Sequence, residues 1–267
     1  MSDGAERIAE AFAGARADGR SAALMPYLMA GYPDLERSRE IARAYVEGGA
    51  DLIELGIPFS DPLADGPVIH AAGVTALRAG VRVDQALAVA SEIAADLPVV
   101  VMCYANLIYA RGLERFIDRL ASLGVAGLIV PDLPFEEAPA TLEACDERGI
   151  ALVPLVAPTT PAERLAAIGQ RARGFMYTVG VTGTTGERAS LDQLLPDILA
   201  RARASTAVPV AVGFGISTPT HAAEAAGAGA DGVIVGTRLV RAASEGPAVV
   251  RSLVEEFASA LRDGALG

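Results

Sequence analysis

The chain contains no lysine, because all 22 of its basic side chains belong to arginine. A Schiff-base intermediate needs a lysine amine, and so does the covalent attachment of pyridoxal phosphate. Both kinds of chemistry are therefore excluded for this chain on its own.

Histidine and cysteine are almost as scarce, with two residues of each. His70 and His221 lack the short spacing that metal-binding histidines share, so we expect no catalytic metal and interpret both as residues on the surface or at the start of a helix. Cys103 lies in an apolar run and Cys145 in a helix-like stretch. A disulfide framework is implausible in this pattern, and we expect both cysteines to be buried thiols.

Positive charge is also in short supply, since the net charge is −11 and the isoelectric point is about 4.7. Nucleic-acid binding relies on clustered basic side chains, so we expect no nucleic-acid partner. No apolar run approaches the roughly 20 residues that a helix needs to cross a bilayer, and the N-terminus lacks a basic region followed by an apolar one. We therefore expect no membrane association and a cytoplasmic location.

What the chain does contain is a repeated pattern of strands and helices. At 267 residues and 52% hydrophobic content, its size fits one large α/β barrel or two smaller domains. Eight apolar, β-branched runs predict strands at residues 23–29, 51–55, 99–103, 127–130, 151–155, 174–178, 208–212 and 232–235. Eight such units favour a closed (β/α)8 barrel, the TIM barrel, with an extra N-terminal helix over residues 6–18. No linker is visible, so residues 1–267 are predicted to form a single domain.

Stretches of helical period separate these runs, at residues 35–47, 113–123, 134–147, 161–170, 191–203, 219–226 and 248–261. Asp34, Thr160 and Thr218 stand where helix N-caps are expected. Glycine stands near four expected helix ends, at positions 48, 124, 149 and 227. The loop over residues 179–190 is long and rich in glycine, and such a loop can close over a ligand.

The most informative stretch covers residues 51–67 and reads DLIELGIPFSDPLADGP. Its apolar run carries Glu54 near the end, and the following loop holds Asp61 and Asp65. Burial raises the pKa of a carboxylate and makes it an acid or base near neutral pH, whereas a loop carboxylate tends to stay ionised. In a barrel, these positions lie at the end where reacting groups gather. The alternatives are an ion pair with arginine for Glu54 and turn formation for the two aspartates.

Glycine-containing turns after the seventh and eighth strands indicate a phosphate site. They read GFGIS over residues 213–217 and Gly-Thr over residues 236–237. Backbone N–H groups in such loops can hold a phosphate without lysine or arginine. The alternative is that the glycines only permit tight turns. Residues 183–186, Gly-Thr-Thr-Gly, would add a further donor from the sixth loop.

The remaining strand ends are apolar or aromatic. They are Tyr27, Met102, Tyr104, Ile129, Leu155, Tyr177 and Phe214. Taken singly, each is more simply a core residue, but as a set on one face they would line a pocket for a flat apolar group. Together with the phosphate turns, they indicate a ligand with an anionic end and an apolar end.

From about residue 5 to residue 262, the chain resembles the α subunit of tryptophan synthase. The resemblance is carried by ELGIPFSDPLADGP over residues 54–67, MCYAN over 102–106, PDLP over 131–134, GFGIS over 213–217 and the Gly-Thr turn at 236–237. It implies the reversible retro-aldol cleavage of indole-3-glycerol phosphate to indole and glyceraldehyde 3-phosphate, with no cofactor in this chain. It also implies a pyridoxal-phosphate-dependent β subunit as partner, in an α2β2 complex that converts the indole to L-tryptophan.

The resemblance also assigns roles residue by residue. Glu54 matches the acid that protonates indole C3 and the base that takes the side-chain hydroxyl proton, and Asp65 matches the acceptor of the indole N–H. Phosphate-binding positions match Gly186, Gly215, Gly236 and Thr237. Positions that contact the indole or the glycerol match Tyr27, Met102, Ile129, Leu155, Tyr177 and Phe214. Thr185 matches the sixth-loop threonine that contacts Asp65 on closure, and Asp61, Asn106 and Pro134 match partner-facing positions.

The sixth loop departs from the usual pattern of the family at Gly180, Val181 and Thr184. Its glycine motif can be aligned over residues 180–183 or 183–186, and the second choice preserves the spacing from Tyr177. Thr237 replaces the more frequent serine and keeps its hydroxyl.

Other functions stay open at this point. A stand-alone indole-3-glycerol phosphate lyase would use the same barrel and acids without a partner. A non-catalytic barrel that binds a phosphorylated metabolite would be expected to lack one of the acids, whereas both are present. A phosphosugar isomerase would share the phosphate turns but not the motif over residues 54–67.

Overall fold

The computed structural model describes residues 3–179 and 195–262. Within these ranges the strands pair in parallel and form one sheet in the order β5-β4-β3-β2-β1-β9-β8-β7-β6. The strands are β1 (Ala23–Met29), β2 (Ile53–Gly56), β3 (Val99–Met102), β4 (Gly127–Ile129), β5 (Ala151–Leu152), β6 (Leu155–Val156), β7 (Met176–Thr178), β8 (Val210–Val212) and β9 (Gly232–Val235). The eight predicted strands are confirmed with small differences at their ends.

The sheet closes on itself through residues 151–156. β5 pairs with β4 and β6 pairs with β7, and only Val153 and Pro154 separate β5 from β6. The Val153 N–H donates to the Leu128 carbonyl at 2.9 Å, and the Pro154 carbonyl accepts from the Tyr177 N–H at 3.0 Å. β5 and β6 are therefore two halves of the predicted fifth strand, which changes neighbour at a proline that has no N–H to donate. The predicted (β/α)8 barrel is confirmed.

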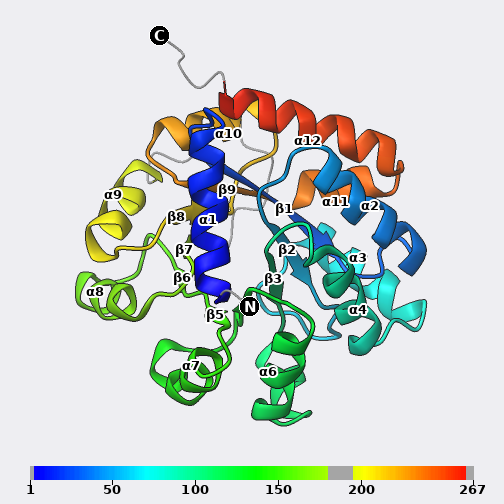
Figure 1. Cartoon of the computed structure of the whole chain (residues 1–267), viewed down its shortest axis with the longest axis horizontal. Coiled ribbons are helices and arrows are strands. Elements are labelled where there is room, and N and C mark those ends of the chain that lie inside the picture. The colour runs from blue at the N-terminus through cyan, green and yellow to red at the C-terminus, as the bar shows by residue number, and fades with distance from the viewer. Residues whose placement is uncertain (1–2, 180–194, 263–267) are drawn as a thin grey trace.

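Helices surround the strands, and α1 lies across one end of the barrel (Figure 1). Within the described ranges they are α1 (Gly4–Ala17), α2 (Leu35–Glu47), α3 (Pro67–Arg78), α4 (Val83–Ile93), α5 (Ala105–Tyr109), α6 (Leu113–Ser122), α7 (Pro139–Asp146), α8 (Ala162–Arg171), α9 (Leu195–Ser205), α10 (Pro219–Gly227), α11 (Thr237–Ala243) and α12 (Pro247–Arg262). α3, α4, α5 and α11 were not among the predicted helices. Over residues 3–179 and 195–262, no helix combines the length and the apolar character needed to cross a membrane.

Three predicted helix boundaries need comment. The predicted helix over 134–147 is instead the 3-10 turn η1 (Phe135–Glu137) followed by α7, because Pro139 suits the first turn of a new helix but not a helix interior. Residues 191–194 of the helix predicted over 191–203 lie outside the described residues. The predicted N-cap at Thr160 is wrong: its hydroxyl accepts a hydrogen bond from the Ala157 N–H at 2.9 Å, and Pro161 precedes α8. Asp34 and Thr218 cap α2 and α10 through their side chains, as predicted.

Alternate strand residues point into the barrel and form an inner core, because side chains along a strand alternate between its two faces. α1 adds Ile8 and Phe12 to this core. A Cβ on Gly232 would lie 2.8 Å from the Phe12 ring, so the glycine makes room for that helix. The strands contribute Met25, Val100 and Ile234, and Leu52 and Phe175 join them from the positions directly before β2 and β7.

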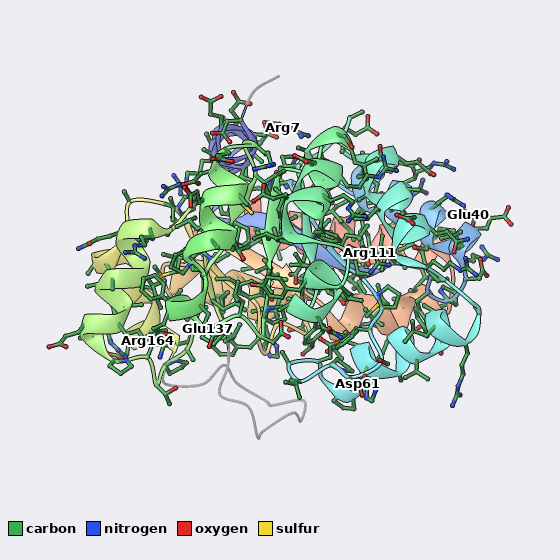
Figure 2. The ribbon with its side chains drawn as sticks, turned by 90° about the horizontal axis from the view of Figure 1, so that it is seen from below. Arg7, Glu40, Asp61, Arg111, Glu137 and Arg164 are labelled. Carbon is green, nitrogen blue, oxygen red and sulfur yellow. The ribbon has the colours of Figure 1, made fainter. Side chains whose placement is uncertain are left out.

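α1 covers the amino-terminal ends of the strands. Its Arg7 donates to the carbonyls of Gly124 at 2.6 Å and Ala94 at 2.5 Å, in the loops that precede β4 and β3. Figure 2 shows Arg7 at one end of the molecule and Asp61 and Glu137 at the other. The carboxyl ends of the strands, where barrel enzymes carry their active sites, are therefore left uncovered by α1.

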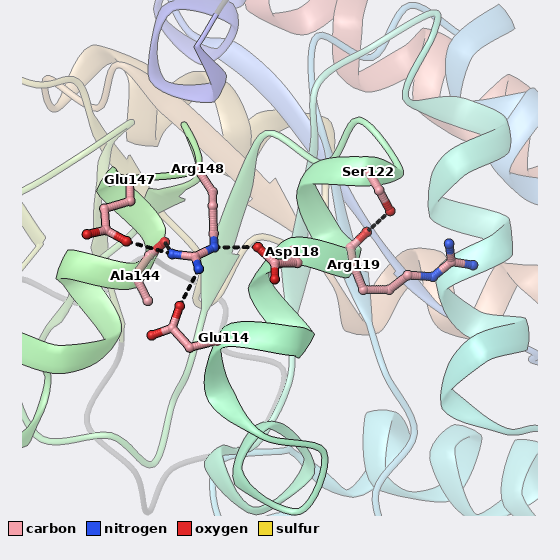
Figure 3. Close-up of polar contacts among 7 residues, drawn as sticks. All are labelled: Glu114, Asp118, Arg119, Ser122, Ala144, Glu147 and Arg148. Atoms are coloured by element: carbon pink, nitrogen blue, oxygen red, sulfur yellow. Dashed lines mark hydrogen bonds and ion pairs between the residues drawn. The ribbon is translucent and has the colours of Figure 1, made fainter.

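An outer core lies between the strands and the helices, and it includes Cys103 and Cys145, which are buried free thiols as predicted. At the surface, α6 and α7 are joined by Arg148, which donates to Asp118 at 2.6 Å and also pairs with Glu114 (Figure 3). Both acids are largely exposed, so each pair adds little to stability.

Candidate active site

Glu54 lies inside the barrel near the carboxyl end of β2. It is level with Tyr27 of β1 and Val100 of β3 in the parallel register. Only 1% of the residue is exposed, and neither carboxylate oxygen has a hydrogen-bond partner among the described residues. The structural alternative, an ion pair with arginine, is therefore not observed within those residues. An unpartnered buried carboxyl group is costly, which points to a role other than stability.

Burial raises the pKa of Glu54 from 4.5 to about 8, and the negative charge of Asp65 adds to the rise. The nearby Tyr177 hydroxyl opposes the rise, although its geometry toward the Glu54 oxygens is not that of a full hydrogen bond. Glu54 is therefore a neutral carboxylic acid near pH 7, with a proton to donate.

Two tyrosines stand beside Glu54. Burial raises the pKa of the Tyr27 and Tyr177 phenols, and the charge of Glu54 adds to both rises. A Cβ on Gly56 would lie 2.0 Å from the Tyr27 hydroxyl, and a Cβ on Gly213 would lie 2.2 Å from the Tyr177 ring. The two glycines therefore allow both phenols to pack directly against the ends of β2 and β8.

Asp65 is half-buried in the loop after β2, and Tyr104 holds it. The Tyr104 hydroxyl donates to Asp65 Oδ1 at 2.9 Å and accepts from the Ala64 N–H at 3.1 Å. The Phe59 ring stacks on Tyr104 with 5.1 Å between centroids. Burial raises the pKa of Asp65, whereas the bond from Tyr104 and the nearby His70 lower it. The loop thus presents an acceptor whose orientation is fixed by its neighbour.

The predicted pocket residues lie in the strands near their carboxyl ends or in the loops directly after them. Met102 is level with Gly56 and Ile129, and Leu155 is level with Tyr177. Of the remaining members, Tyr27 is buried beside Glu54 and Phe214 is half-buried directly after β8. The structure therefore brings the apolar and aromatic strand ends together on the same face as the two acids.

The turn after β8 presents free backbone donors. The N–H groups of Phe214, Gly215 and Ile216 have no hydrogen-bond acceptor among the described residues. Gly215 has a φ of +71°, a left-handed conformation that favours glycine. Gly236 precedes α11 and Thr237 begins it, so the first N–H groups of that helix, which have no partner within the helix, lie at the neighbouring strand end. Gly186 and Thr185 lie outside the described residues.

The residues predicted to face a partner, Asp61, Asn106 and Pro134, are all exposed. Asp61 accepts a hydrogen bond from the Ser60 hydroxyl at 2.5 Å, so it also stabilises its own turn. Leu63, in the same loop, is 84% exposed, which is unusual for a leucine. Asp61, Leu63 and Pro134 lie in loops and Asn106 in the first turn of α5, all following the carboxyl ends of strands, at the face where Figure 2 places Asp61.

Two further contacts organise this face and were not inferred from the sequence. One is the hydrogen bond from Tyr104 to Asp65, since Tyr104 was interpreted only as a pocket residue. The other is made by Asp132, whose Oδ1 accepts from the Ala105 N–H at 2.8 Å and so ties the loop after β4 to the start of α5. The PDLP and MCYAN motifs contained both residues, but the sequence does not show that their loops meet.

Other parts of the molecule are weaker candidates for the active site. A cavity of about 390 Å³ lies between α3 and α11, but neither Glu54 nor Asp65 lines it. Among the described residues, no group of three or more histidine, cysteine, aspartate and glutamate side chains is arranged to hold a metal ion. We therefore place the candidate site at the two acids.

The closed parallel barrel and the two carboxyl groups at the carboxyl ends of its strands are those of a (β/α)8-barrel enzyme. The model of one family, tryptophan synthase alpha chain, matches residues 12–264. The chain belongs to this family.

Individual relatives agree with that assignment. The tryptophan synthase alpha chain of Synechococcus elongatus is 48% identical over 257 residues, covering 95% of this chain and 96% of its own. The alpha chain of Methanosarcina mazei is 45% identical and covers 92% and 90%. Among solved structures, a chain of Mycobacterium tuberculosis tryptophan synthase is 42% identical with a TM-score of 0.90, covering 96% of this chain and 98% of its own. A chain from the α2β2 complex of Pyrococcus furiosus is 38% identical with a TM-score of 0.83, covering 90% and 98%.

Proposed function

We propose that this chain carries out the reaction of its family, the reversible cleavage of indole-3-glycerol phosphate to indole and glyceraldehyde 3-phosphate, with Glu54 as general acid and base. The observation that carries the proposal is the buried carboxyl group of Glu54, which has a pKa of about 8 and no hydrogen-bond partner in the part of the chain that the structure describes. A neutral carboxylic acid at this place can protonate carbon and then act as a base once it is ionised.

The chemistry needs two proton transfers. Protonation of indole C3 by Glu54 leaves a positive charge on the ring nitrogen, and Asp65, held by Tyr104, accepts the N–H hydrogen bond and stabilises that charge. The Glu54 carboxylate then removes the proton of the side-chain hydroxyl. The bond to C3 breaks, its electrons return to the indole ring, and the hydroxyl carbon becomes the aldehyde. Neither step requires a lysine, a metal or a bound cofactor.

The two ends of the substrate fit two parts of the site. The free N–H groups around Gly215 and the helix start at Gly236 and Thr237 would bind the phosphate, with Gly186 contributing from the sixth loop. The indole and the glycerol would be contacted by the predicted pocket residues, Tyr27, Met102, Ile129, Leu155, Tyr177 and Phe214. Thr185 would contact Asp65 when the sixth loop closes.

The proposal includes a partner, a pyridoxal-phosphate-dependent β subunit in an α2β2 complex, which would bind at Asp61, Asn106 and Pro134. Support comes from the exposure of these residues and of Leu63, and from the P. furiosus relative, which was solved as part of an α2β2 complex. The indole would pass to that subunit, and this chain would need no cofactor of its own.

Indole release from indole-3-glycerol phosphate tests the proposal. The purified chain is assayed alone and with a tryptophan synthase β subunit at saturating concentration, and complex formation is followed by light scattering. We expect slow release by the chain alone and a clear acceleration in a complex of larger mass. Fast release that the β subunit does not change would favour a stand-alone lyase, and no release under either condition would refute the reaction.

A further inference from the structure

His221 contacts the turn that would bind the phosphate. It lies in the first turn of α10, where its N–H donates to the Thr218 hydroxyl at 3.2 Å. Its imidazole Nδ1 is 2.9 Å from the Gly215 carbonyl oxygen and 3.2 Å from the Ser217 hydroxyl. The side chain therefore bridges the start of α10 and the turn over residues 213–217.

The contact with Gly215 specifies the tautomer of His221. A carbonyl oxygen only accepts hydrogen bonds, so the 2.9 Å contact requires a hydrogen on Nδ1. The other neutral tautomer would place two acceptors against each other at this distance. Nδ1 is thus the donor, and the Ser217 hydroxyl can accept from the same hydrogen or turn away. The Ser217 N–H is also directed at Nδ1, but at 3.5 Å this contact is longer than an ordinary hydrogen bond, so the 2.9 Å contact with Gly215 decides the tautomer.

Fixing the Gly215 carbonyl also fixes a backbone donor. The peptide unit that joins Gly215 to Ile216 is planar and trans, so its carbonyl and its N–H point in opposite directions. The carbonyl is held by His221, and the Ile216 N–H on the other side has no acceptor among the described residues. Glycine at 215 can adopt many conformations, so without this hydrogen bond the peptide is free to rotate.

We infer that His221 is a positioning residue for the phosphate site: its Nδ1–H holds the Gly215 carbonyl and so keeps the Ile216 N–H on the other side of that peptide directed at an anion. The inference rests on the proposed function for the presence of a phosphate at this turn. It assigns to His221 no contact with the substrate and no part in proton transfer, so its loss weakens binding of the phosphate end without slowing the chemical step.

Two variants of similar size separate the hydrogen bond from the volume of the side chain. His221→Asn places an amide N–H close to the position of Nδ1, and His221→Leu offers no donor. We expect His221→Leu to raise the KM for indole-3-glycerol phosphate and the Kd for glycerol 3-phosphate by about five- to tenfold, with kcat and the Kd for indole unchanged. His221→Asn should restore binding to within about twofold of the original chain. Thr220→Ala, at an exposed position on the same helix, is the control.

Equal loss in the Asn and Leu variants, or a fall in kcat at unchanged KM, would overturn the inference. If the original chain releases indole and the Leu variant binds glycerol 3-phosphate equally well, only the role of His221 fails. If the original chain neither releases indole nor binds glycerol 3-phosphate, the proposed function fails with it.

A second measurement needs no change at His221 itself. Because the chain has only two histidines, the ring nitrogens of His221 can be assigned in a nitrogen-15 NMR spectrum with His70→Gln as reference. The Nδ1–H form is expected at a pH where the imidazole is neutral. The Nε2–H form would contradict the geometry on which the inference depends.

Discussion

The Tyr104 hydroxyl donates a 2.9 Å hydrogen bond to Asp65 and accepts a 3.1 Å bond from Ala64, so one phenol fixes both the carboxylate and the backbone beside it. Tyr104 follows β3 and Asp65 follows β2, and the contact joins two neighbouring strand ends. A carboxylate that must meet an indole N–H benefits from such a fixed orientation, because productive geometry is then present before the substrate arrives.

Replacing Tyr104 by phenylalanine tests this positioning role. Tyr104→Phe keeps the stacking on Phe59 but removes the hydrogen bond, and we expect kcat/KM for indole-3-glycerol phosphate to fall about tenfold. Tyr109→Phe is the matched control, since Tyr109 is half-exposed and its hydroxyl lies 3.4 Å from that of Thr141, well away from the acids. Equal activity of the two variants, assayed without a partner, would show that the bond to Asp65 does not matter.

The pH dependence of the reaction should report Glu54. The proton that Glu54 donates is present below its pKa of about 8, so kcat/KM should decline as the pH rises through that value. On the acid side, activity should fall as Asp65 is protonated, at a higher pH than for an ordinary aspartate because burial raises its pKa. The measurement is the pH profile of initial rates, with circular dichroism as a control for folding. A profile that stays flat well above pH 8 would contradict the assignment.

Glu54 should also make stability depend on pH. Its pKa is higher in the folded chain than the ordinary value of 4.5, so the folded state binds more protons between pH 4.5 and 8 and loses stability as the pH rises through this window. At about 1.4 kcal/mol per pKa unit, the full cost is on the order of 4 to 5 kcal/mol. Glu54→Gln should therefore be more stable than the original chain above pH 8 and equally stable below pH 4.5 in denaturant titrations. A difference in unfolding free energy between the two chains that stays constant from pH 4.5 to 8 would refute the raised pKa of Glu54.

A buried ion pair at the opposite end of the barrel should matter for stability alone. Arg20 pairs with Asp51 at 2.5 Å, and both residues are more than nine-tenths buried. Asp51 also accepts from the Leu24 N–H at 2.8 Å, and burial raises its pKa to about 6 in spite of both partners. Arg20→Met leaves that carboxyl group unpaired and should lower the free energy of unfolding by about 3 to 5 kcal/mol.

The control for that change is Arg37→Met, which breaks an exposed pair with Glu40 and should cost less than about 0.5 kcal/mol. Adding Asp51→Asn to Arg20→Met should recover part of the loss, because an amide is cheaper to bury than a carboxylate and can still accept from Leu24. Catalytic rates at temperatures where each variant is folded should not change. If Arg20→Met lowered the free energy of unfolding as little as Arg37→Met, the stabilising role of the buried pair would be contradicted.

Much of the fold follows from the sequence, because barrel strands are short apolar runs and the helices between them are amphipathic. The sequence could not show that the fifth strand divides at Pro154, since that depends on how the sheet curves between β4 and β7. Thr160 was wrongly predicted to cap α8. A threonine hydroxyl can accept a hydrogen bond from backbone N–H groups that precede or follow it in the chain, and here it accepts from the preceding Ala157 N–H. The helices α3 and α4 are rich in alanine and lack a marked charged face, so their pattern is weak.

The candidate site, too, could be predicted from the sequence only in part. Glu54 was recognisable because an acid in an apolar run is rare, and Asp65 because it shares the motif. The sequence could not show that Glu54 has no hydrogen-bond partner within residues 3–179 and 195–262, or that Tyr104 holds Asp65 across 39 positions. Such contacts depend on the order of the strands in space. His221 was interpreted as a helix-start residue, which is correct, but its bond to Gly215 is visible only in three dimensions.

The most direct test of the central claim compares indole release by the original chain and by Glu54→Gln at pH 7, together with the binding of glycerol 3-phosphate to both. Glutamine has nearly the same shape but no acidic proton, so we expect the rate to fall by about 10² to 10⁴ while binding stays within about twofold. Turnover near the original rate by a folded Glu54→Gln variant would contradict the role of Glu54 as the acid and base of this reaction.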